Sequence, residues 1–202
     1  LTGDLEAARA IVQQSPGNSR LAATLGWLYL HYWERDWDEL VRLAGSIPSN
    51  DTYFEGYAPF IAELAQYFRD GVEVARPVLQ QAVGTVTANI EASPDSMNLL
   101  LWSARLHACL EEKDAALRDV ESALDLASAK EGGAKMRAEE EAAAMYAAIG
   151  REDEALDILE RLLVSHYPGA ITVHQLRHIA DWDPLRDHPR FQALLEKYAQ
   201  EG

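Results

Sequence analysis

The sequence is poor in the residues that build disulfide frameworks and membrane spans. It holds a single cysteine, Cys109, among 202 residues, which excludes an internal disulfide and a zinc site made of several cysteines. Glycine and proline are few, at 12 and 8 residues, and no apolar run is long enough to cross a bilayer. The first residues also lack the basic and then apolar layout of a signal peptide. Hydrophobic residues still make up 48% of the chain, which is enough for a packed core.

Positive charge is scarce as well. The chain carries 18 lysines and arginines against 33 aspartates and glutamates, for a formal net charge of −15. Proteins that bind nucleic acids gain most of their affinity by neutralising phosphates, so this balance disfavours nucleic acid and anionic membrane surfaces. An acidic surface suits basic partners, but it also serves solubility alone, and the sequence leaves both explanations open.

Helical periodicity dominates what is present. Apolar residues recur at spacings of three and four in almost every window, and the good helix formers Ala, Leu, Glu and Arg are abundant. No alternating strand pattern and no Asn-Gly hairpin signal appears. Helix-breaking residues interrupt the pattern at short intervals, at 15–18, 47–50, 70–71, 93–95, 131–133, 150 and 168–169. The pattern predicts an all-α chain of short antiparallel helix hairpins.

A repeat is clearest between residues 136 and 167. Ala143 and Ala155 hold its small positions, Tyr146 and Leu159 its large ones, and a glycine turn separates the two halves. This order follows the pattern W-x2-L-G-x2-Y, then A-x3-F, of about 34 residues. Weaker copies run over 21–48, 53–91 and 98–126. Most of the chain therefore resembles the tetratricopeptide repeat family.

The resemblance implies a right-handed superhelix of stacked antiparallel helix hairpins that ends in capping helices. The whole chain is then one domain. We expect a half repeat at 1–16, helix pairs at 19–50, 52–92, 95–130 and 132–168, and capping helices at 170–202. Because the first unit lacks its first helix, we expect the sequence to be the C-terminal part of a longer protein.

The last stretch departs from the repeat. Residues 181–195 read DWDPLRDHPRFQALL, and they resemble the closing phrase of bacterial tetratricopeptide proteins whose repeats follow a winged-helix regulator, a kinase or a nucleotide cyclase. Asp183 lies directly before Pro184, and Asp187 lies two residues before Pro189. Proline is tolerated at a helix start, so both aspartates are predicted to be N-caps. Trp182 and Phe191, with nearby leucines, are predicted to cover the apolar end of the stack.

The resemblance also implies a concave groove lined by the first helix of each unit, which would hold a protein or peptide. The positions that match groove-lining ones are Arg20, Trp27, His31, Asn98, Arg105 and Arg137. Arginines can hold a carboxylate or an acidic peptide through two hydrogen bonds, and a tryptophan can anchor an apolar side chain. The plain alternatives stay open: an aromatic-rich core and ordinary surface arginines.

Signatures of catalysis are weak. There is no phosphate-binding glycine loop and no Gly-x-Ser-x-Gly elbow. Cys109 stands among apolar residues, which favours a small buried hydrophobe over a nucleophile. His174 and His178 lie one helical turn apart, but no third ligand is fixed, which favours an ordinary histidine pair over a metal site. The run 139–141 of three glutamates predicts a solvated helix face.

We therefore expect a protein-interaction module with no catalytic residue, no cofactor and no metal. The partner is a protein or peptide rather than nucleic acid, and this segment does not insert into a membrane. The alternative is a regulatory or sensory C-terminal arm of a bacterial signalling protein or transcriptional regulator. An enzyme built on the histidine pair is a third and weaker hypothesis. Pairing of two copies stays open, and the bacterial cytoplasm is favoured over the periplasm.

Overall fold

The computed structural model describes residues 5–14, 20–47, 58–129, 132–165 and 171–198. All elements in these ranges are helices, which confirms the all-α prediction. In chain order they are α1 (Leu5–Gln14), α2 (Arg20–Glu34), α3 (Trp37–Gly45), α4 (Ala58–Asp70), α5 (Val72–Ala92), α6 (Met97–Cys109), α7 (Lys113–Ser128), α8 (Gly133–Ala148), α9 (Glu152–Leu163), α10 (Val173–His178), the 3-10 helix η1 (Ala180–Leu185) and α11 (Pro189–Lys197). None of these described helices has both the length and the apolar character needed to cross a bilayer.

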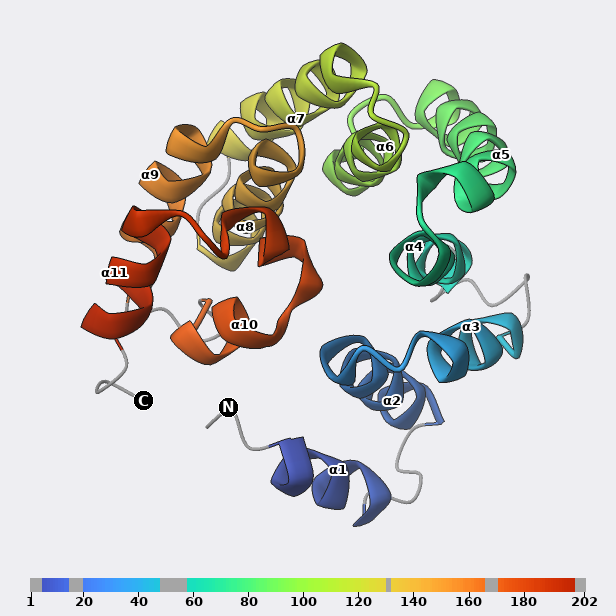
Figure 1. Ribbon diagram of the computed structural model, residues 1–202. Coiled ribbons are helices and arrows are strands. Elements are labelled where there is room, and N and C mark those ends of the chain that lie inside the picture. The colour runs from blue at the N-terminus through green and yellow to red at the C-terminus, as the bar shows by residue number, and fades with distance from the viewer. Residues whose placement is uncertain (1–4, 15–19, 48–57, 130–131, 166–170, 199–202) are drawn as a thin grey trace.

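Successive helices pack against one another along an arc. The arc curves from α1 through α5 and α7 and returns, so that α10 and η1 face α2 across a central space (Figure 1). An ion pair joins the two ends of the arc. Arg35, between α2 and α3, donates hydrogen bonds of 2.7 Å to both carboxylate oxygens of Asp183 in η1. The fold is therefore repeat-like and nearly closed on itself.

Three of the hairpin turns share one hydrogen-bond pattern. A backbone N–H bonds the carbonyl five residues earlier: Asp36 to His31 at 2.9 Å, Glu112 to His107 at 2.9 Å and Arg151 to Tyr146 at 2.7 Å. The residue before each donor has a positive φ: 58° at Arg35, 64° at Glu111 and 84° at Gly150. This combination is the Schellman motif, which ends a helix and reverses the chain. The backbone thus repeats where the sequence does not, since only Gly150 is the residue type expected there.

The largest core lies in the C-terminal half. It reaches from α6 to α11 and includes Leu159, Trp182 and Phe191, all at most 2% exposed. Trp182 and Phe191, predicted to cover the end of the stack, are both buried in this cluster. Alanines fill much of α8, including Ala142 and Ala143, and they leave room for close helix packing.

The predicted N-caps of the last helices are wrong. His188 caps α11, where its Nδ1 accepts a hydrogen bond of 3.2 Å from the N–H of Arg190. Pro189 takes the first helical position, since its fixed φ suits that site, and this puts the cap one residue after Asp187. Asp183 lies inside η1 and binds Arg35 and Arg186 instead of a helix N-terminus.

Candidate functional site

A cavity of about 710 Å³ lies inside the arc. Its walls come from α1, α2, α4, α6 and α8, with single residues of α9, α10 and η1, Ile171 before α10 and Ile179 after it. Among the described residues, α3, α5, α7 and α11 contribute nothing to this lining. From α2 to α8, alternate helices therefore face inward, and residues from both ends of the chain share one space.

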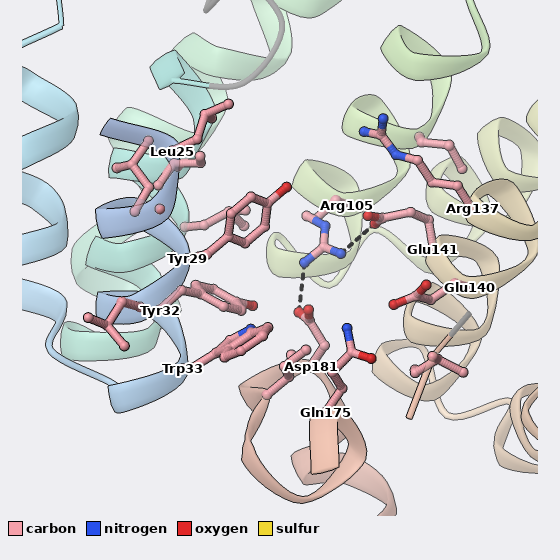
Figure 2. Close-up of a pocket in the computed structure, with 18 of the residues that line it drawn as sticks. Leu25, Tyr29, Tyr32, Trp33, Arg105, Arg137, Glu140, Glu141, Gln175 and Asp181 are labelled. Atoms are coloured by element: carbon pink, nitrogen blue, oxygen red, sulfur yellow. Dashed lines mark hydrogen bonds and ion pairs between the residues drawn. The ribbon is translucent and has the colours of Figure 1, made fainter. Parts of the chain in front are cut away.

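One wall is aromatic. Tyr29, Tyr32 and Trp33 follow one another along α2, and they point from that helix toward Arg105 (Figure 2). Tyr29 keeps 56% of its surface exposed. Trp102 of α6 adds a further ring and packs against Phe60, with ring centroids 5.4 Å apart.

Arg105 of α6 forms the polar centre of the cavity. Its guanidinium donates to Asp181 of η1 at 2.7 Å and to Glu141 of α8 at 2.5 Å (Figure 2). Only 9% of the residue is exposed. Burial alone would lower the pKa of Arg105, but the charges of Asp181 and Glu141 outweigh it and hold that pKa well above its ordinary value. This ion triad joins α6, α8 and η1 at the polar centre of the cavity.

Two more ionisable groups lie close to the triad. Burial, together with the charges of Glu141 and Asp181, raises the pKa of Glu140 to about 7. Burial, and then the charge of Asp181, raises the pKa of Tyr32 well above its ordinary value. The Tyr32 hydroxyl is enclosed but makes no hydrogen bond of normal geometry within the described part of the chain. These groups carry polar capacity that the fold itself does not use.

Of the predicted contact residues, Asn98, Arg105 and Arg137 line the cavity. Arg105 differs from the prediction in one respect, because its guanidinium already holds two carboxylates of the same chain. Arg137 is exposed on α8, on the opposite side of Glu141 from Asp181 in the view of Figure 2. The side chain of Arg20 lies outside the described residues.

Trp27 and His31 do not line the cavity. Their rings stack at 5.6 Å, and the Arg9 guanidinium of α1 lies 5.7 Å from the Trp27 ring. The inward face of α2 instead runs through Tyr29 and Trp33. A shift of two residues turns a helix by about 200°, so the two faces are almost opposite. Aromatic residues occupy both faces of α2, and for that reason the sequence did not reveal which of them turns inward.

The acidic residues of the cavity were missed. The glutamate run 139–141 was predicted to be a solvated face, yet Glu140 and Glu141 line the cavity. A signal existed, since Arg137, Glu140 and Glu141 are spaced by three and four residues and so share one helix face. The role of Asp181 had no local signal, because its partner Arg105 is 76 residues away.

The histidine pair and Cys109 were the other candidates for chemistry. The described residues contain no group of three or more His, Cys, Asp or Glu side chains placed to hold a metal ion. The pKa of His178 is lowered by burial and by the nearby charge of Arg186. Burial raises the pKa of the Cys109 thiol to about 12, so the thiol stays protonated at neutral pH and is a poor nucleophile.

The geometry is that of an all-helical, repeat-like chain around an aromatic and acidic cavity. The resemblance to tetratricopeptide repeats rests on the motif residues quoted above. No protein-family model, no curated protein and no solved structure matches this chain.

Proposed function

We propose that this chain is a protein-interaction module of the tetratricopeptide type, and that its cavity receives a short segment of a partner protein. The cavity itself carries the proposal. Ligand sites are typically concave spaces of roughly 300–1,000 Å³ with apolar and aromatic walls and a few convergent polar groups. At about 710 Å³, with Tyr29, Trp33 and Trp102 around Arg105, this cavity has both the size and the lining of such a site.

The volume suits a short segment rather than a whole domain. A helix about 10 Å wide that rises 1.5 Å per residue fills on the order of 120 Å³ per residue, so the cavity would hold about six residues. Two wall residues are large, apolar and still exposed: Tyr29 at 56% and Ile11 at 64%. A partner side chain that covers them would gain apolar burial without displacing the core.

Panning a library of random hexapeptides on the immobilised chain tests this proposal. Selected peptides should bind the wild type and Val74→Ala equally, because Val74 is an exposed residue of α5 outside the cavity. Tyr29→Ala should weaken binding by at least about fivefold, in line with the loss of an aromatic contact. Asn98→Trp, which adds bulk to the lining, should block binding. Selected peptides that bind all four proteins equally would contradict the proposal.

The ion pair between Arg35 and Asp183 favours a second candidate, the regulatory arm. It joins the ends of the arc beside the cavity, so an occupant that contacts both α2 and η1 would change their separation. A ligand that binds one spacing better than another shifts the population toward it. Dyes at Ser46→Cys and Glu196→Cys, with Cys109→Ala, would report that separation. A distance that stays constant when a selected peptide binds would exclude this role.

A further inference from the structure

The charged groups of the cavity do not balance. Among the residues that the structure describes, three acidic and two basic side chains line it: Glu140, Glu141, Asp181, Arg105 and Arg137. Arg105 is buried and donates to two of the acids, so it has little capacity for an incoming anion. Arg137 is exposed at the edge. The centre of the cavity therefore keeps an excess of negative charge.

The same centre offers free acceptors and ring faces. A carboxylate has about four acceptor positions, and Asp181 and Glu141 each give one to Arg105. The ring of Trp33 points from α2 toward the same carboxylates (Figure 2). Carboxylates together with an aromatic ring form the surroundings in which an ammonium group is stabilised, by charged hydrogen bonds and by the ring quadrupole.

We propose that the cavity selects an alkylammonium group on an apolar body, seated between Glu140, Asp181 and the aromatic wall of α2. In the peptide that the proposed function requires, this group is a lysine side chain flanked by apolar residues. An anionic segment would instead meet three carboxylates and two arginines, of which the buried one, Arg105, already binds two of these carboxylates. The inference deepens the proposed function and rests on it for the peptide nature of the ligand.

Proton release should accompany binding. Burial, Glu141 and Asp181 raise the pKa of Glu140 to about 7, whereas Arg105 and Arg137 lower it, so about half of the empty molecules hold this proton at pH 7. The charged and titratable groups around Glu140 are Arg137 and Glu141 from α8, Arg105 from α6, Asp181 from η1 and Tyr32 from α2. An ammonium group beside Glu140 stabilises its carboxylate form. Binding at pH 7 should therefore release about half a proton per site.

Three probes share a phenylethyl group and differ in the group attached to it: phenethylamine, 2-phenylethanol and 3-phenylpropionate. Together they test the charge preference of the cavity. By calorimetry we expect the amine to bind at least about tenfold more tightly than the alcohol, and the acid more weakly than the alcohol. Titrations of the amine in buffers of different ionisation enthalpy measure the released proton. Equal affinities, or tightest binding of the acid, would overturn the inference.

Glu140→Gln keeps the shape of the side chain and removes its charge. It should reduce the affinity for phenethylamine by roughly tenfold more than the affinity for 2-phenylethanol, and it should abolish proton release. The matched control is Glu139→Gln, because Glu139 adjoins Glu140 on α8 but does not line the cavity. If both variants behaved alike, the assignment to Glu140 would fail.

The peptide arm separates this inference from the proposed function. Acetylated Leu-Leu-Lys-Leu-Leu amide is compared with the same peptide carrying norleucine in place of lysine. Library peptides that bind without any preference for lysine would support the proposed peptide binding but overturn the proposed preference for an ammonium group. Phenethylamine that binds as expected, with no hexapeptide binding at all, would support the ammonium site and contradict the peptide function.

Discussion

The two ends of the arc have unequal cores. At the C-terminal end, one cluster joins the helices from α6 to α11 around Leu159, Trp182 and Phe191. At the N-terminal end, the cluster of α2 and α3 has four buried members among the described residues: Leu28, Leu40, Ala44 and, from α4, Ala65. The helix α1 has no buried residue. Both ends contribute to the cavity, so one wall is firmly supported and the other is not.

The weaker end is attached by contacts of a different kind. Gly26 lets α1 and α2 approach closely, since a Cβ added there would lie 3.1 Å from Cγ2 of Val12. Arg9 pairs with Glu34 and stacks over Trp27. Regions with few buried apolar contacts open at lower free energy than the rest of a protein. We therefore expect the aromatic wall on α2 to move more readily than the acidic wall on α8.

The largest effect is expected where the cavity meets the stronger core. Arg105→Ala should lower the free energy of unfolding by about 3–5 kcal/mol, because it leaves Asp181 and Glu141 without the guanidinium that both bind. Urea denaturation measures this loss. Arg190→Ala is the control: Arg190 binds three carboxylates, one more than Arg105, but it is exposed, so its removal should cost much less than that of Arg105. Equal losses would show that burial of the triad has no special weight.

A matched pair of leucines tests the comparison of the two cores directly. Leu159 and Leu40 are both fully buried, the first in the C-terminal core and the second in the N-terminal one. Truncation to alanine costs about 2–5 kcal/mol depending on how well the site collapses, and we expect Leu159→Ala near the top and Leu40→Ala near the bottom of this range. Hydrogen exchange should quicken only in α1 to α4 for Leu40→Ala, because α4 shares the cluster around Leu40. Uniform exchange across the chain would contradict two unequal cores.

Glu140 makes stability depend on pH. Its pKa is about 7 in the folded chain against an ordinary 4.5, so between these values the folded state holds the proton more tightly than the unfolded state. The contribution of the protonated Glu140 to the free energy of unfolding is fully present below pH 4.5. It is lost as the pH rises to 7, by up to about 3 kcal/mol. Subtracting the urea profile of Glu140→Gln from that of the wild type isolates this fall. A difference that is flat across this range would show that the carboxyl titrates normally.

The smallest effect concerns the Schellman turns. Glu111 holds a φ of 64° where glycine is favoured, so Glu111→Gly should raise stability by about 0.5–1 kcal/mol. Gly150→Ala should lower it by about 1 kcal/mol, because φ there is 84°. Arg35→Gly should gain less than Glu111→Gly, since it also removes the ion pair with Asp183. Thermal unfolding of the three variants gives the order, and a gain at Arg35 as large as that at Glu111 would show that the ion pair contributes nothing.

Local patterns in the sequence predicted the local features of this fold. Apolar spacing and helix breakers indicated the helices, and the predicted groove residues Asn98, Arg105 and Arg137 line the cavity. The partners of Arg105 were not predicted, since pairing across 36 and 76 residues leaves no periodic trace. The inward face of α2 was mistaken because aromatic side chains surround that helix. Exposure of an aromatic residue depends on what packs around the whole arc, and this is not encoded in one helix.

Cys109 has a practical consequence for all of these comparisons. It lies in the cluster shared by α4, α5 and α6, midway between the two ends of the arc. Since the thiol is buried and protonated, a reagent such as a disulfide dye reaches it only when this middle segment opens. The rate at which the Cys109 thiol is modified therefore measures how often the helices around it open. The same rate, compared with and without a bound ligand, would show whether an occupied cavity slows this opening, and no label has to be introduced.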